Sequence, residues 1–313
     1  IPFMSIASIF TLSTAQTAME LGCIYALVAL ALFLSYSILN IADLSTDSCF
    51  TLGCAVCCQV TLLGHPILAL FAAMLAGVLS GYITAFLQTR LGVESILAGI
   101  IVNTGLYTVN LAVMGFSSTL SIFKCDNIFS MAKSALGGVL GSWYKLVVAL
   151  VIVLAVAALL ALFLKTRLGL SIRATGDSPD MIKASSVNPA FTITVGLCIS
   201  GSLTALSGAV LAQYQKSCDI NLGTGMVTIA LASLIIGETL VGKGGMFRRA
   251  LGAVIGSCLY RLFVAVALRL NVPAECMKLV SALIVAVAIA SPALKRYAAF
   301  QKQKAARRGG AKC

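Results

Sequence analysis

Long apolar stretches, separated by short polar connections, run along almost the whole chain. Five of them contain no Asp, Glu, Lys or Arg, at residues 48–89, 95–123, 146–164, 184–215 and 220–237. Each can cross a hydrocarbon layer about 30 Å thick as an α-helix, and the first can hold two crossings. The pattern therefore predicts an all-α, polytopic membrane protein.

Apolar runs and loop signals together predict about ten transmembrane helices. We expect them at residues 4–19, 21–39, 48–64, 67–88, 93–115, 145–165, 190–213, 226–242, 250–268 and 276–293. The first is the most polar, because serine, threonine and glutamine recur in it. No basic segment precedes it, so a cleavable signal peptide is not expected.

Composition supports the same fold class. Of the 313 residues, 60% are hydrophobic and 10% are charged, and the mean hydropathy is +1.03. A soluble core cannot hide that much apolar surface. Most of the eleven cysteines lie within apolar runs, which is typical of small buried residues. The CxxC spacing at Cys54 and Cys57 lacks a second pair and a nearby histidine, so we predict no metal site.

Basic residues set the expected orientation. The net charge of +12 is scattered over short loops and a tail, which argues against a nucleic-acid partner. Of the Lys and Arg residues, fifteen fall on one side of the predicted spans and five on the other. The richer side is expected to be cytoplasmic. Both termini, including the basic tail at 294–313, are then cytoplasmic, and residues 115–144 form an external loop.

The cytoplasmic connection at residues 166–189 is the most informative polar segment. It predicts a turn and then a short helix, since Ser178 can cap, Pro179 suits the first helical position and Asp180 complements the helix dipole. Met181 and Ile182 would be exposed at its tip. This helix either docks another subunit or lies on the membrane surface.

Three stretches resemble a family of transport proteins. Residues 169–183, GLSIRATGDSPDMIK, look like the cytoplasmic coupling loop of permeases for branched-chain amino acids, ribose-type sugars and related solutes. Residues 22–53 are similar to permeases for tryptophan and tyrosine uptake within that superfamily, and residues 200–210 with 223–237 add a third match. The resemblance covers most of residues 20–295.

This resemblance implies a type II ABC importer fold, with residues 1–313 forming one transmembrane permease domain in the cell membrane. The implied partners are a second permease copy, cytoplasmic ATPase subunits, an extracytoplasmic solute-binding protein and membrane lipid. The span count adds candidate inverted repeats at 21–165 and 190–293. A role in coupling to the ATPase is expected for Arg173, Gly176, Asp177, Ser178, Pro179, Asp180, Met181, Ile182 and Lys183.

ATP is expected to be hydrolysed by a separate chain. Residues 237–244 imitate a phosphate-binding loop, but Gly244 stands where Ser or Thr should hold magnesium. No catalytic constellation lies in the spans, so this chain is expected to be no enzyme and to need no cofactor. The resemblance favours an aromatic or branched-chain amino acid as solute, with a sugar or nucleoside as alternatives. An ion-coupled secondary transporter, the alternative function, would need carboxylates at mid-membrane.

Polar side chains inside the spans are costly and are therefore candidates for the solute path. Glu238 lies at a cytoplasmic span end, where it can line the path or pair with Lys243. Arg261 can snorkel outward, pair with a neighbouring helix or face a cavity.

Two further pairs of polar residues carry expectations. Asn103 and Asn110 are seven residues apart on one helical face, and they either hold helices together or line a pore. Asp43 and Asp47 are expected to cap the helix that starts beside them.

Overall fold

The computed structural model describes residues 12–123, 125–184, 187–242 and 244–269, with a few single residues between 279 and 290. Residues 1–11, which include the start of the predicted first span at 4–19, lie outside the described residues, as do nearly all of the span at 276–293 and the tail at 294–313. Lys243 lies outside them as well.

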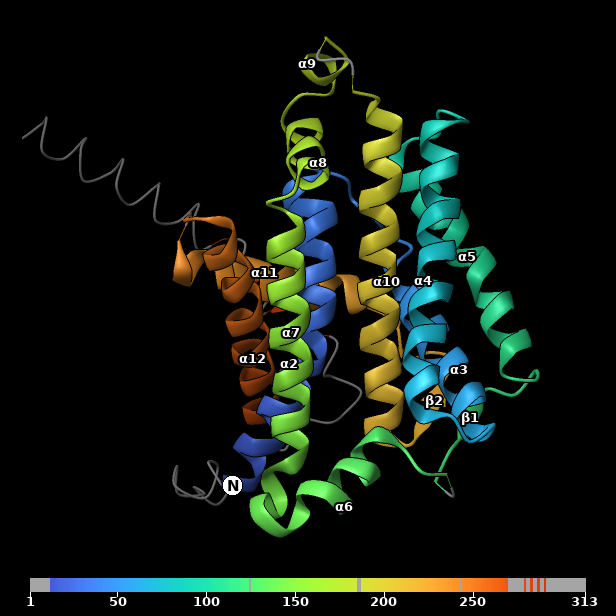
Figure 1. Ribbon diagram of the computed structural model, residues 1–313, viewed down its shortest axis with the longest axis vertical. Helices are drawn as coiled ribbons and strands as arrows, with labels where there is room; N and C mark the ends of the chain where they lie inside the picture. The colour runs from blue at the N-terminus through green and yellow to red at the C-terminus, as the bar shows by residue number, and fades with distance from the viewer. Residues whose placement is uncertain are drawn as a thin grey trace, which may run out of the picture.

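The described chain is largely helical (Figure 1). Its helices are α2 (Leu12–Leu32), the π-helix η1 (Phe33–Ile38), α3 (Thr46–Leu62), α4 (Pro66–Thr89), α5 (Ser95–Val113), α6 (Ile128–Leu140), the short 3₁₀ turn η2 (Gly141–Trp143), α7 (Tyr144–Phe163), α8 (Arg167–Asp177), α9 (Pro179–Ala184), α10 (Pro189–Gln215), α11 (Met226–Val241) and α12 (Met246–Arg269). Two short strands, β1 (Thr119–Ser121) and β2 (Ser217–Asp219), pair antiparallel with Thr119 opposite Asp219.

Within the described residues, six helices are long and apolar enough to cross a membrane. They are Ser13–Ile38, α4, α5, α7, α10 and α12. The apolar helices α3 and α11 are shorter, with 17 and 16 residues. The predicted class, an all-α polytopic membrane protein, is therefore confirmed.

One predicted boundary is wrong. Residues 4–19 and 21–39 were expected to form two spans, but α2 runs unbroken from Leu12 through residue 20 and continues into η1. Glu20, the charged residue between the two ranges, is buried and satisfied. Gln16 Nε2 donates to Glu20 Oε1 at 3.0 Å, and the Tyr214 hydroxyl donates to Oε2 at 2.8 Å. A carboxylate with such partners can stay inside a helix bundle.

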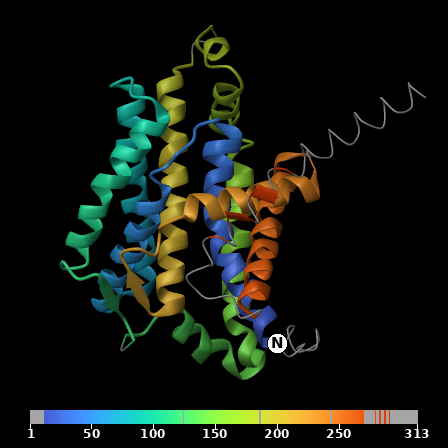
Figure 2. The same ribbon diagram turned by 180° about the vertical axis from the view of Figure 1, so that it is seen from behind.

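The helices α2 and α10 run in opposite directions through the centre of the molecule (Figure 1). Helix α10 packs against α3 and α4, whereas α2 packs against α7, α11 and α12. In Figure 2, which shows the molecule from behind, α11 crosses the fold at a steep angle to the long helices. The most buried residues belong to the two central helices, so the core lies between them and their neighbours.

Small residues allow the central helices to approach closely. A Cβ atom added at Gly201 of α10 would collide with the Gly77 carbonyl oxygen of α4, and the reverse also holds. Hydroxyl groups add polar contacts, since Ser200 Oγ donates to the Ala31 carbonyl at 3.0 Å and Ser207 Oγ to the Ile24 carbonyl at 2.7 Å. Close backbone contact and such hydrogen bonds hold membrane helices together.

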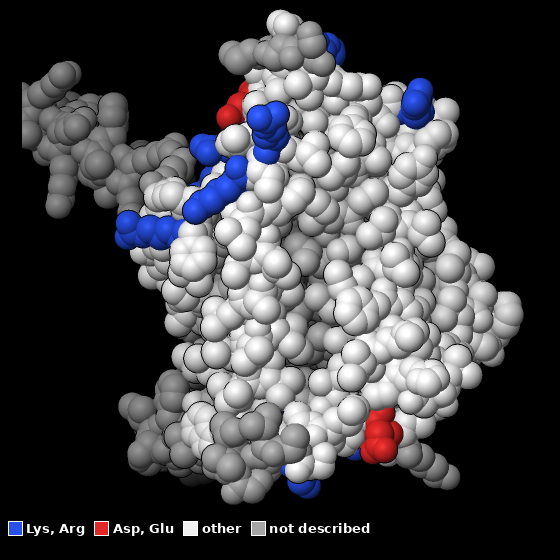
Figure 3. All heavy atoms as spheres, in the orientation of Figure 1, with Lys and Arg blue, Asp and Glu red and all other residues white. Residues whose placement is uncertain are grey.

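Charged side chains lie at the two ends of the face seen in Figure 3, and an uncharged band separates them. The α8 and α9 end carries most of the basic groups visible there, while α6 lies at the opposite end (Figures 1 and 3). This arrangement fits a chain that crosses a bilayer several times.

The predicted orientation can be tested by cysteine labelling. Ser134 on α6 and Ala184 at the end of α9 are both exposed. In a background without native cysteines, an impermeant maleimide added to intact cells should label Ser134→Cys. It should label Ala184→Cys only after the membrane is permeabilised. The reverse pattern would contradict an external α6.

Candidate functional site

The predicted coupling segment folds as two helices at one end of the molecule. Helix α8 starts after Thr166, whose hydroxyl oxygen accepts a hydrogen bond from the Gly169 amide at 3.3 Å. Helix α9 begins at Pro179, as predicted. The turn expected from residue 173 is wrong, because the backbone stays helical as far as Asp177 and becomes extended only at Ser178.

The tip of this segment is partly buried. Asp180 and Lys183 are exposed and form an ion pair of 3.3 Å, which contributes little to stability. Ile182, by contrast, is only 6% exposed, so its predicted exposure is wrong. The reason is that α9 contacts α8 and α10. The side chains of Pro179 and Met181 lie outside the described part.

Helix α8 touches both central helices. A Cβ atom at Gly176 would collide with the Ile38 carbonyl oxygen at the end of η1. Gly176 has no positive φ, so it is needed for close approach and not for a left-handed turn. The hydroxyls of Thr175 and Thr192 are 2.8 Å apart and link α8 to α10. A displacement of α8 would therefore also displace η1, at the end of α2, and α10.

A charged cluster joins η1 to α11 and α12. Glu238 forms an ion pair with Arg249, with 2.7 Å between Oε1 and Nη2. The Ser37 hydroxyl in η1 donates to Glu238 Oε1 at 3.0 Å and accepts from Arg249. Arg249 also lies over the Phe33 ring, 5.3 Å from its centroid. Single π-helical turns are common at functional positions. The segments that this cluster joins, η1, α11 and α12, are therefore candidates for movement during transport.

Asn103 and Asn110 both connect α5 to Ser48 at the start of α3. Asn103 Oδ1 accepts from the Ser48 amide at 3.0 Å, and its carbonyl oxygen accepts from the Ser48 hydroxyl at 2.8 Å. Asn110 is buried, and its Nδ2 donates to the Ser48 carbonyl at 3.0 Å. Asn110 thus holds two helices together, whereas Asn103 does so and also lines a groove.

Neither of the two aspartates predicted as caps of α3 caps that helix. Asp43 Oδ1 accepts from the amide and the hydroxyl of Ser45 at 2.9 and 2.6 Å, so it fixes the turn before α3, which has no side-chain cap hydrogen bond. Asp47 instead caps α11 from across the fold. Its two oxygens accept from the amides of Gly225 and Val227 at 3.0 and 2.9 Å. This role was missed, because nothing local in the sequence connects positions 178 residues apart.

A polar groove of about 250 Å³ lies between α3, α5 and the connection at 220–225. Its lining includes Asp47, Asn103, Tyr107 and Asn221. Asn103 and Tyr107 are the ninth and thirteenth of the nineteen residues of α5, so the groove lies near the middle of a membrane-spanning helix. A polar groove at that depth is not stable against lipid and must be covered by protein or filled with water.

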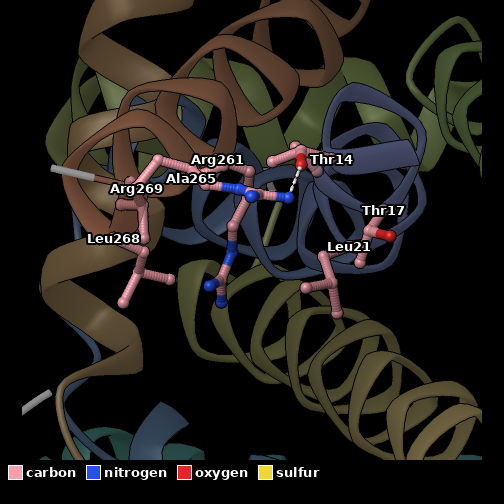
Figure 4. Close-up of a pocket in the computed structure, with 9 residues that line it drawn as sticks. Thr14, Thr17, Leu21, Arg261, Ala265, Leu268 and Arg269 are labelled. Atoms are coloured by element: carbon pink, nitrogen blue, oxygen red, sulfur yellow. Dashed lines mark hydrogen bonds between the residues drawn. The ribbon is translucent and has the colours of Figure 1, made fainter. Parts of the chain in front are cut away.

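Arg261 lies elsewhere, in a pocket of about 320 Å³ between α2 and α12 (Figure 4). Its guanidinium carbon is 3.6 Å from the centroid of the Tyr25 ring. Arg269 reaches Thr14 at the same pocket, whose walls are otherwise mostly apolar (Figure 4). Arg261 therefore both contacts a neighbouring helix and faces a cavity.

The four predicted solute-path residues are thus dispersed, and only Asn103 lines the groove beside α5. Tyr107 follows Asn103 by four residues on the same helical face, a spacing that could have identified it. Among the described residues, no group of three or more His, Cys, Asp or Glu side chains could hold a metal ion. The thiols of Cys54 and Cys57 instead point to backbone carbonyls of α10.

Comparison with known proteins identifies the family to which the chain is similar. Residues 15–289 match the family described as the permease component of branched-chain amino acid transport systems. The tyrosine transport system permease protein of Clostridioides difficile (strain R20291) is 31% identical over 276 residues, which are 88% of this chain and 90% of that protein.

Two further relatives show the breadth of the similarity. An uncharacterized protein of Rickettsia prowazekii (strain Madrid E) is 28% identical, over 88% of this chain and 96% of its own. The D-allose transport system permease protein of Escherichia coli (strain K12) is 28% identical, over 80% of this chain and 73% of its own. No solved structure matches.

Proposed function

Because this chain belongs to the family of branched-chain amino acid transport permeases, it is the permease component of an ABC transport system, and we propose that its solute is an aromatic amino acid. The observation that carries the proposal is the 31% identity to a tyrosine transport permease over 88% of the chain. Sugar permeases are similar at lower identity and over less of their length.

The family also implies the partners. A permease of this kind works with ATPase subunits and a solute-binding protein, so ATP hydrolysis belongs to another chain. This chain then needs no cofactor of its own. The exposed, charged tip formed by Asp180 and Lys183 supports α8 and α9 as the contact with the ATPase. We take that end and the basic C-terminal tail to be cytoplasmic, with lipid around the apolar belt. Because α2 starts at the opposite end (Figure 1), we no longer place the N-terminus on the cytoplasmic side.

Two copies of the chain form the translocation path in this proposal. The groove at Asn103 and Tyr107 supports a second copy, since a polar surface near mid-membrane must be shielded from lipid. Residues 21–165 and 190–293 act as inverted repeats. Their first long helices, α2 and α10, run in opposite directions, and the packing of α10 on α4 mirrors that of α2 on α12.

Reconstitution tests the proposed solute. The permease, its ATPase and its binding protein in proteoliposomes should take up radiolabelled L-tyrosine only when ATP is inside. Uptake of L-leucine and D-allose should be at least tenfold slower. A complex that accumulates D-allose but not L-tyrosine would contradict an amino-acid substrate. An inactive ATPase variant serves as the control for leakage.

A further inference from the structure

Among the described residues, the groove between α3, α5 and residues 220–225 is lined by one charged side chain, that of Asp47. No Lys, Arg or His of the described part lines it. The Asp47 carboxylate accepts two backbone amides of α11. A carboxylate has about four acceptor positions, so it can still accept from a ligand. At this depth its charge favours a cationic group.

The opposite side of the groove offers donors. Asn103 uses its Oδ1 to accept from Ser48, and no described residue accepts from its Nδ2. Tyr107 is 48% exposed, and no described residue bonds its hydroxyl. Both groups can donate to an anionic ligand atom.

The geometry points to this groove as a binding site for a free amino acid, with Asp47 taking the ammonium group and Asn103 with Tyr107 taking the carboxylate. The inference rests on the proposed function, because only a zwitterionic solute uses both ends. A volume of about 250 Å³ per chain suits half of a site that a second copy closes. In this site the ligand contacts Asp47, the residue of α3 that caps α11. Binding can therefore change the contact between α3 and α11.

Equilibrium binding to the permease and ATPase complex in nanodiscs, without binding protein, tests the site. In this assay two competitors are added against radiolabelled L-tyrosine. Tyramine lacks the carboxylate, and 3-(4-hydroxyphenyl)propionate lacks the ammonium group. The native complex should prefer L-tyrosine to the propionate by about tenfold or more. In Asp47→Asn this preference should disappear. In Tyr107→Phe, affinity for L-tyrosine should fall about threefold or more, while tyramine binding stays unchanged.

The matched control is Asp219→Asn, which removes a nearby carboxylate that also accepts a backbone amide but does not line the groove. It should keep the native preference. An unchanged preference in Asp47→Asn, or equal displacement by D-allose and L-tyrosine, would overturn the site. Because Tyr107 forms no described bond, Tyr107→Phe keeps the test decisive even where Asp47→Asn folds poorly. Tyrosine uptake by the full complex distinguishes the proposed solute from the proposed binding site. If the complex takes up tyrosine but the binding assay contradicts the groove, only the binding site is excluded.

Discussion

An Arg249→Met variant is expected to lose nearly all solute-stimulated ATP hydrolysis and to unfold at a lower temperature than the native chain. Arg249 neutralises Glu238 at 2.7 Å, and both side chains are only about a quarter exposed, at 23% and 27%. Without the guanidinium, the hydrogen bond from Ser37 is the one that the carboxylate keeps among the described residues. Breaking a fully buried pair costs about 3–5 kcal/mol, so partial exposure suggests roughly 2–3 kcal/mol here.

The functional loss has a separate cause from the loss of stability. The cluster is the point where η1, α11 and α12 are joined, so the variant lets three segments move independently. Melting in nanodiscs and hydrolysis with the loaded binding protein measure the two effects. Arg248→Met is the matched control, because Arg248 is the exposed neighbour on the same helix. Native hydrolysis in Arg249→Met would contradict the role of the cluster.

A double variant separates charge from linkage. In Arg249→Met with Glu238→Gln, no unpaired charge is left, and the glutamine amide can still accept from Ser37. We expect it to regain most of the lost stability while stimulated hydrolysis stays low. Full recovery of both would mean that the cluster only neutralises a charge and does not transmit motion.

The membrane class and most spans were predictable because hydropathy is a property of each segment alone. Seven predicted spans, from 48–64 to 250–268, agree with the observed helices within four residues. The break expected near residue 20 failed because a charged residue ends a span only where it lacks a partner. Glu20 has Tyr214, which lies 194 positions away.

The candidate site was less predictable because its contacts, like that of Glu20 with Tyr214, join different helices. Asp47 looked like a local cap, yet the amides it binds belong to α11. Glu238 was expected to line the path or to pair with Lys243, which lies outside the described residues. Among the described residues its ion pair is with Arg249, eleven residues along the chain. Such pairs are set by which helices meet, and periodicity within one helix carries no information about that. The π-helical turn at η1 likewise has no signature in the residues that form it.

Gly176→Val is expected to uncouple the transporter, with solute-stimulated ATP hydrolysis reduced at least tenfold. Any Cβ at this position meets the Ile38 carbonyl oxygen, and the Leu39 Cα lies 3.0 Å from it. Backbone atoms at a helix end cannot yield as a flexible side chain can, so α8 must move away from η1. The contact between the coupling segment and the extension of α2 is then lost.

The exposed tip formed by Asp180 and Lys183 is untouched by this change, so the ATPase should still co-purify with Gly176→Val. Leu168→Val is the matched control, since it puts a valine on the exposed side of the same helix. It should hydrolyse ATP at the native stimulated rate. If Gly176→Val did so as well, α8 could not act through η1, and the link between α8 and α10 at Thr175 and Thr192 would have to carry the motion alone.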